Sequence, residues 1–203
     1  CVEPRFVVPP CRLLTKRGLF YFQYKNQTLK SFEKDLRKGY DKSMIFKTYS
    51  TKETKKLAAD LAQEVAKSKL QKHARVFALE GELGAGKTTF IQGFAKALKI
   101  KRRITSPTFV LIKNYKLQTT PVVKQGSLRG TANYKLLIHV DAFRLKDWRE
   151  LVPLGIKEMF ASPKNIILIE WAERVRPILP RKYIKIHIDH LGKTSRKITI
   201  TTK

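Results

Sequence analysis

The chain has 203 residues, which is enough for one well-buried domain with an appendage and too few for two large domains. Lys and Arg number 43 against 16 Asp and Glu, and the formal charge of +27 favours contact with polyanions, although scattered lysines also serve simply to solvate a surface. No apolar run is as long as a membrane span, and two cysteines support neither a disulfide framework nor a zinc site. We therefore expect a soluble, cytoplasmic protein that contacts no membrane.

Residues 1–43 show no clean helical or strand period, and the chain begins with Cys while Met44 stands immediately before the first well-organised segment. We expect residues 1–43 to be a disordered extension or an incorrectly assigned start, and residues 44–203 to form the functional domain. The alternative of a real N-terminal subdomain stays open, because the aromatic cluster at 20–22 has the character of packed side chains.

Residues 45–49 alternate in polarity, which predicts a strand. Ser50 and Glu53 then match the capping box S-x-x-E, which predicts the start of a helix. Apolar residues recur at helical spacing after this point, at Leu57, Leu61 and Val65. The helix is therefore expected to bury one face.

Residues 81–88 read GELGAGKT and fit the phosphate-binding pattern G-x-x-x-x-G-K-[ST] at every specified position. An apolar run at 75–80 predicts a buried strand before this loop, and 88–98 predicts a helix after it. The glycines let backbone N–H groups surround phosphate oxygens at the positive end of that helix. Lys87 would neutralise the terminal phosphates and Thr88 would offer its hydroxyl to Mg²⁺, so the sequence predicts a nucleoside triphosphate site.

Further strands follow the loop helix. Residues 106–112 begin with an extended Ser-Pro pair and continue as a β-branched run, and 118–133 form a polar excursion that resembles a hairpin. Apolar runs at 136–141 and 166–170 have the pattern of strands covered on both faces. The last two predicted strands, 183–189 and 197–201, alternate with period two and are joined by a turn at 191–193, so they predict an antiparallel hairpin.

These elements predict an α/β fold of the P-loop NTPase kind: a mostly parallel central sheet flanked by helices, closed by a C-terminal antiparallel hairpin. Two of the central strands end in acids, Asp141 and Glu170. Because ligands of open α/β sheets bind beyond the carboxyl ends of the strands, both acids are expected near the phosphate loop, where one holds Mg²⁺ and one orients the attacking water. Each acid taken alone could instead cap the next helix.

Several blocks in the same order resemble the bacterial TsaE (YjeE) family, small ATPases of the tRNA threonylcarbamoyladenosine pathway. The blocks are LEGELGAGKTTF at 79–90, SPTFVL at 106–111, HVDAFRL at 139–145, LGIKEMF at 154–160 and IEW at 169–171. A generic P-loop protein would share only the first block. The resemblance covers residues 44 to 203.

The resemblance implies roles for individual residues. ATP would be wrapped by Glu82, Leu83, Gly84, Ala85, Gly86, Lys87, Thr88 and Thr89. Thr88 and Glu170 would hold Mg²⁺, Asp141 would support the metal or the hydrolytic water, and Thr108 would lie near the terminal phosphate. Thr51 matches a position that in the family lies by the nucleotide base.

The implied function is that of a Mg²⁺-dependent ATPase subunit required for threonylcarbamoyl modification of the adenosine adjoining the tRNA anticodon. It would act with the TsaD and TsaB proteins and meet tRNA through that complex, and its ATPase would be weak without partners because no arginine finger is evident near the loop. Two alternatives stay open. One is a small-molecule kinase on the same scaffold, and the other is a basic RNA-binding adaptor with a vestigial nucleotide site.

Overall fold

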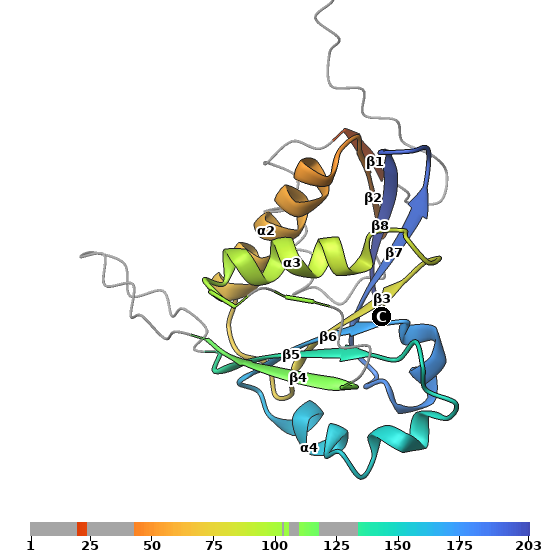
Figure 1. Ribbon diagram of the computed structural model, residues 1–203. Helices are drawn as coiled ribbons and strands as arrows, with labels where there is room; N and C mark the ends of the chain where they lie inside the picture. The colour runs from red at the N-terminus through yellow and green to blue at the C-terminus, as the bar shows by residue number, and fades with distance from the viewer. Residues whose placement is uncertain (1–19, 24–42, 103, 106–109, 118–133) are drawn as a thin grey trace, which may run out of the picture.

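The computed structural model describes residues 20–23, 43–102, 104–105, 110–117 and 134–203 (Figure 1). Thr108 and the predicted excursion at 118–133 lie outside the described residues. Of residues 1–42, the structure describes only the strand β1 (Phe20–Gln23), which pairs in parallel with β2 (Ser43–Thr48). The expectation that residues 1–43 are a disordered extension or an incorrectly assigned start stays a prediction.

The centre of the molecule is one mixed sheet. Its strand order is β1-β2-β8-β7-β3-β6-β5-β4. The remaining strands are β3 (Arg75–Glu80), β4 (Ile112–Lys116), β5 (Leu136–Asp141), β6 (Asn165–Glu170), β7 (Ile184–His190) and β8 (Arg196–Thr202). The four neighbours β7, β3, β6 and β5 run in parallel, whereas β8 runs antiparallel to both β7 and β2, and β4 antiparallel to β5. The prediction of a largely parallel core with a C-terminal antiparallel hairpin is confirmed.

Helices cover the sheet on both sides (Figure 1). On one face lie α2 (Thr51–Lys67) and α3 (Lys87–Ala97), and on the other lie α4 (Ile156–Ala161) and two 3₁₀ segments, η1 (Trp148–Leu151) and η2 (Ala172–Ile178). Every residue of β3 and of β6 is buried, with alternate side chains in the two hydrophobic clusters. The continuous apolar runs in the sequence therefore correspond to strands that helices cover on both faces. None of the helices in the described part of the chain is long and apolar enough to cross a membrane.

The predicted capping box at the start of α2 is present in a shifted form. The Ser50 side chain accepts a hydrogen bond from the Glu53 N–H at 3.2 Å, as expected. The Glu53 carboxylate, however, accepts from the N–H of Tyr49 at 2.9 Å, one residue before the cap. The helix begins where the sequence predicted, and its apolar stripe is buried.

Of the predicted strand at 106–112, residues 106–109 lie outside the described residues. Val110 and Leu111 lie in a bend, and β4 begins only at Ile112. The Leu111 carbonyl still accepts from the Asp141 N–H at 3.1 Å, so the chain approaches β5 before regular pairing starts. The β-branched run favours an extended backbone, but the position of the neighbouring strand β5 determines where regular strand pairing begins.

Helices α2 and α3 cross closely at Gly93. A Cβ atom on Gly93 would overlap the backbone of Lys55, including its carbonyl oxygen. The neighbouring face of α3 packs Phe94 edge-on against Phe77 of β3, with ring centroids 5.1 Å apart. The absence of a side chain at Gly93 thus lets the helix that follows the phosphate loop lie flat against α2.

We expect Gly93→Ala to lower the free energy of unfolding by about 1 to 3 kcal/mol, because backbone atoms must move apart, which outweighs the roughly 1 kcal/mol that Ala contributes to helix propensity. Denaturant unfolding measures this change. Gly192→Ala is the matched control, since a Cβ atom there meets nothing within 4 Å. Equal stability of the two variants would contradict the assignment of Gly93 as a close-contact position.

Candidate nucleotide-binding site

The loop between β3 and α3 has the backbone that phosphate binding requires. Gly81, Gly84 and Gly86 have φ angles of 136°, 76° and 103°, in the region that side chains disfavour. A Cβ atom at Gly81 would also overlap the carbonyl oxygen of Ile188 on β7. Helix α3 starts after Gly86 with no side-chain cap, so its positive end is presented to the loop by backbone groups alone.

Arg196, at the start of β8, holds the loop from outside. Its Nε donates to the Ala85 carbonyl at 2.9 Å, and Nη2 donates to the Gly84 carbonyl at 3.4 Å. Because a trans peptide points its C=O and N–H in opposite directions, the N–H of Gly86 points away from Arg196. The sequence offered no signal for this residue, which lies more than a hundred positions from the loop.

Lys87 folds back over the loop. Its Nζ donates to the carbonyl oxygens of Gly81 at 2.6 Å and Glu82 at 2.9 Å, and lies 3.8 Å from the centroid of the Trp171 ring. Burial lowers the pKa of Lys87, and the nearby carboxylates, Glu170 foremost, oppose that shift. The predicted phosphate ligand is thus held at the loop by hydrogen bonds to two backbone carbonyls.

Thr88 and Glu170 are brought together as the sequence predicted. The Thr88 hydroxyl contacts both carboxylate oxygens of Glu170, at 3.0 and 2.8 Å. In the described part of the chain no group of three or more His, Cys, Asp or Glu side chains forms a metal cage. One hydroxyl and one carboxylate are, however, a donor set that suits Mg²⁺ when phosphates and water complete its shell, so the residues fit a nucleotide-bound Mg²⁺.

His139, the first residue of the HVDAFRL block, contacts Glu170 as well. Its Nε2 lies 2.9 Å from Oε1 of Glu170, and the ring is fully buried. A carboxylate only accepts, so Nε2 is the donor and Nδ1 has no hydrogen-bond partner among the described residues. His139 therefore orients the Glu170 carboxylate from β5, while Thr88 contacts the same carboxylate from the start of α3. The H-x-D spacing places His139 and Asp141 on one face of β5, which was the available signal.

Asp141 lies directly beside Glu170 in the parallel register of β5 and β6, so the two carboxylates share one face at the carboxyl edge. Asp141 is buried and its Oδ1 accepts from the Phe143 N–H at 3.0 Å. Asp141 thus caps a turn, whereas the next helical segment, η1, is capped by Asp147 and not by Asp141 as the alternative interpretation supposed.

Other predicted residues surround this centre less closely. Glu82, Leu83 and Gly84 are exposed on the loop, and Thr89 is half-buried. Thr51 is exposed at the start of α2, on the same edge of the sheet, since Thr48 pairs with the loop-binding Arg196 in the β2–β8 register. Thr108 falls outside the described residues.

Trp171 adopts a left-handed backbone, with φ of 57°, immediately after Glu170. Its ring packs on Phe143 with centroids 4.9 Å apart and on Lys87. A left-handed backbone is unfavourable for a residue other than glycine, and such residues cluster at functional sites. The ring is expected to sense movement of Lys87.

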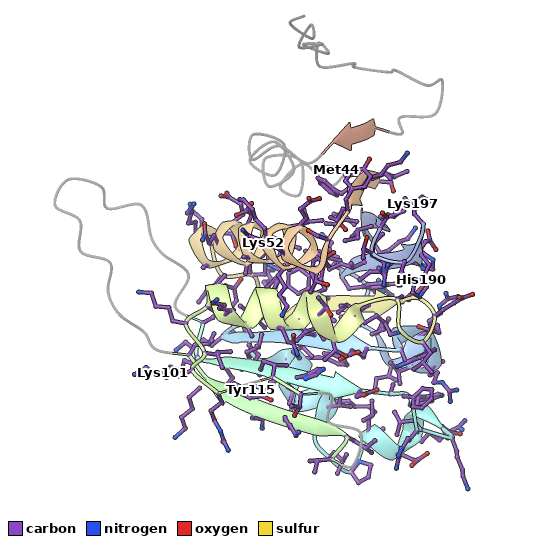
Figure 2. All side chains as sticks on the ribbon, turned by 45° about the horizontal axis from the view of Figure 1, so that its top comes forward. Met44, Lys52, Lys101, Tyr115, His190 and Lys197 are labelled. Atoms are coloured by element: carbon purple, nitrogen blue, oxygen red, sulfur yellow. The ribbon has the colours of Figure 1, made fainter. Side chains whose placement is uncertain are left out.

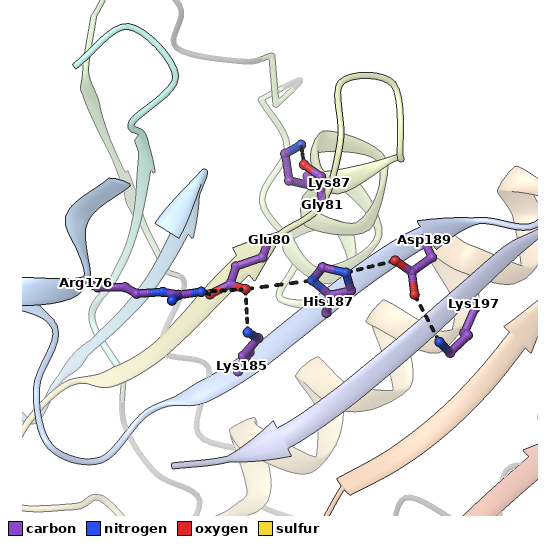
Figure 3. A network of polar contacts seen from close by, with 8 residues as sticks. All are labelled: Glu80, Gly81, Lys87, Arg176, Lys185, His187, Asp189 and Lys197. Atoms are coloured by element: carbon purple, nitrogen blue, oxygen red, sulfur yellow. Dashed lines mark hydrogen bonds and ion pairs between the residues drawn. The ribbon is translucent and has the colours of Figure 1, made fainter. Parts of the chain in front are cut away.

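Sequence analysis overlooked a third strand-end acid, Glu80, which ends β3 next to the loop. Its buried carboxylate contacts Lys185, Arg176 Nη2 at 3.3 Å and His187 Nδ1 at 3.8 Å (Figure 3). The network continues from His187 Nε2 to Asp189 at 2.8 Å and on to Lys197.

A pocket of about 480 Å³ opens beside this network and the first residues of the loop. It is lined by Glu80, Gly81, Glu82, Trp171, Glu173, Arg176, His187, Ile188, Asp189 and His190. Burial by itself would raise the pKa of Asp189, but Lys197 and His187 lower it overall. The cations and carboxylates of this wall largely pair with one another, so the wall braces β7 against the root of the loop.

Comparison with known proteins identifies one family. A family model described as "Threonylcarbamoyl adenosine biosynthesis protein TsaE" matches residues 48–198. The chain is 36% identical over 160 residues to the TsaE protein of Bacillus subtilis, covering 79% of this chain and 86% of that protein. It is 34% identical over 156 residues to the TsaE protein of Aquifex aeolicus, covering 76% and 92%.

The fold is also similar to the crystal structure of YdiB from Bacillus subtilis, with a TM-score of 0.56 and 32% identity over 80% of this chain and 86% of that one. The family model's match to residues 48–198 covers the phosphate loop, all three strand-end acids and His139. The chain therefore belongs to the TsaE family of tRNA threonylcarbamoyladenosine biosynthesis proteins.

Proposed function

We propose that this chain is the Mg²⁺-dependent ATPase subunit of threonylcarbamoyl transfer to the adenosine adjoining the tRNA anticodon, acting in the cytoplasm with the TsaD and TsaB proteins. The contact of Thr88 with both oxygens of Glu170, beside a glycine loop of phosphate-binding shape, is the observation that carries the proposal. It unites the two predicted metal ligands from positions 82 residues apart.

The chain's own residues would act as follows. Loop N–H groups and the amino end of α3 bind the phosphates, and Lys87 leaves the Gly81 and Glu82 carbonyls to neutralise them. Thr88 and Glu170 would hold Mg²⁺, which supplies charge neutralisation and polarises the phosphoryl group when bound. His139 keeps the Glu170 carboxylate oriented, and Asp141 would position the attacking water.

The contacts of two arginines near the loop, Arg196 and Arg176, support the expectation of partner dependence. Arg196 donates to loop carbonyls from outside, and Arg176 pairs with Glu80 on the opposite face of the sheet. Neither is aimed at charge that develops on a transferring phosphoryl group. A group supplied in trans raises the rates of such sites by about 10³ to 10⁵, so TsaD–TsaB is the expected source of activation.

The test of the proposal is phosphate release from ATP by the chain alone, with TsaD–TsaB, and with TsaD–TsaB plus tRNA. We expect slow release alone and stimulation of at least about tenfold by the partners, since an added transition-state contact of about 1.4 kcal/mol has that effect. Fast activity that transfers phosphate to a soluble small molecule and ignores the partners would favour the kinase alternative. RNA binding without any ATP binding would favour the vestigial adaptor.

We expect Lys87→Ala to weaken ATP binding about 30-fold or more and to abolish turnover, because a charged hydrogen bond of roughly 2 kcal/mol or more is lost. Nucleotide affinity is measured by calorimetry or by the fluorescence of Trp171. Lys96→Ala is the control, an exposed lysine in the last turn of the same helix, and it should leave affinity unchanged. Unaltered binding in Lys87→Ala would refute the assignment of the phosphate site.

We expect Glu170→Gln to lower ATP turnover by at least about 10²-fold while changing ATP affinity in the absence of Mg²⁺ by little, since an amide is a poorer ligand of the hard cation and the loop is untouched. Asp141→Asn should behave in the same way. Glu158→Gln, an exposed acid on α4, is the control. Full activity of both site variants at saturating Mg²⁺, with partners present, would mean that these acids are structural caps.

A further inference from the structure

The parallel strands of this protein separate charge along their length. β3, β5 and β6 end in Glu80, Asp141 and Glu170 at the nucleotide edge, whereas Lys135 and Lys164 immediately precede β5 and β6 at the opposite edge. Six residues per strand place the two edges about 20 Å apart. Acidic side chains therefore lie at one edge of these strands and basic side chains at the other.

We define the basic rim as six exposed cations at the edge that lies opposite the nucleotide site: Lys99, Lys101, Arg102, Lys116, Lys135 and Lys164. Figure 2 shows Lys101 and Tyr115 at one corner of the molecule, where the end of α3 meets the end of β4. Three of the six, Lys116, Lys135 and Lys164, lie on neighbouring strand ends, because the Leu117 N–H donates to the Lys135 carbonyl and the Lys135 N–H donates to the Lys164 carbonyl.

The rim has no acidic counterpart. No Asp or Glu occurs between Glu82 and Asp141 in the sequence, a stretch that contains five of the six rim residues. None of the six makes an ion pair with any residue that the structure describes. An ordinary solvated surface intersperses both signs, as α2 does with Lys56–Asp60 and Lys67–Glu64.

Lys99 supports the same interpretation from the backbone. It ends α3 in a left-handed conformation, with φ of 61°, and the Ile100 N–H closes the helix on the Ala95 carbonyl at 3.1 Å. Glycine is the residue that this position favours, because a Cβ atom is unfavourable there. A lysine at the helix end thus places charge on the rim at some cost in stability.

From this geometry we propose that the basic rim binds the phosphate backbone of RNA, and specifically the tRNA on which the family's pathway acts. The proposal goes beyond nucleotide hydrolysis, which takes place at the other edge of the sheet. A row of unpaired cations on adjacent strand ends, about 4.8 Å apart, matches closely spaced phosphates and releases their counterions. The two described tyrosines beside the rim, Tyr115 and Tyr134, are both buried, so neither ring is offered for base stacking and binding should be indifferent to sequence.

The test measures binding of an unmodified tRNA transcript by the full chain across a salt titration. We expect Lys116→Ala, Lys135→Ala and Lys164→Ala, combined in one variant, to weaken binding at least tenfold at physiological salt. The slope of log K against log salt should fall by about 2 to 3, as three phosphate contacts are lost. ATP affinity should be unchanged, so failure of this proposal and failure of the ATPase proposal would be told apart.

The matched control removes the same charge elsewhere, in a variant that combines Lys52→Ala, Lys146→Ala and Lys157→Ala, three exposed lysines at helix starts. It should bind tRNA nearly as the parent chain does. Equal losses in the two triple variants would show that net charge alone attracts RNA and would overturn the proposal. So would rim-dependent binding to phosphatidylserine vesicles or to an acidic polypeptide in the absence of any tRNA binding at physiological salt.

Lys99→Gly separates binding from folding. It removes a rim charge while relieving the left-handed backbone, so we expect a higher midpoint of thermal unfolding together with weaker tRNA binding. Loss of tRNA affinity in a more stable protein cannot come from unfolding. Unchanged tRNA affinity and salt slope in Lys99→Gly and in the rim triple variant would refute the assignment.

Discussion

The contact between the Thr88 hydroxyl and the Glu170 carboxylate is the interaction on which the site depends. It joins the first turn of α3 to the end of β6, and His139 supports the same carboxylate from β5. Three elements that are distant in sequence are thereby held around one oxygen pair. The proposed Mg²⁺ would take the place of this bond while His139 keeps Glu170 oriented, which would couple the loop to the neighbouring strands.

The phosphate loop is supported by β7 and β8, which lie on the other side of β3 from β6 in the sheet. Gly81 lies against the backbone of Ile188, and Arg196 donates to the carbonyls of Gly84 and Ala85. The antiparallel hairpin β7–β8 is therefore part of the nucleotide site, although no residue of it belongs to the phosphate-binding motif. The buried Glu80 ties that hairpin to the root of the loop through Lys185 and His187.

Charge in this protein is divided between two edges. Carboxylates collect where β3, β5 and β6 end, and a cation with phosphates is the partner that such an edge favours. The opposite edge gathers unpaired lysines and one arginine, whose natural partner is a polyanion. One sheet can thus bind two anionic ligands, a nucleotide at one edge and RNA at the other, without bringing their negative charges close together.

The sequence by itself determined the phosphate loop, its flanking strand and helix, the capped start of α2, the strand-end acids Asp141 and Glu170, and the family. Each of these features depends on local residue spacing or on a run of apolar residues, and short-range sterics and burial determine the structure that such patterns adopt. Only the tertiary structure decided that His139 holds Glu170, that Arg196 braces the loop, that Glu80 anchors the hairpin and that β4 begins at Ile112. These four features depend on strand order and register. Order and register bring together residues that are far apart in the sequence, and no local pattern encodes them.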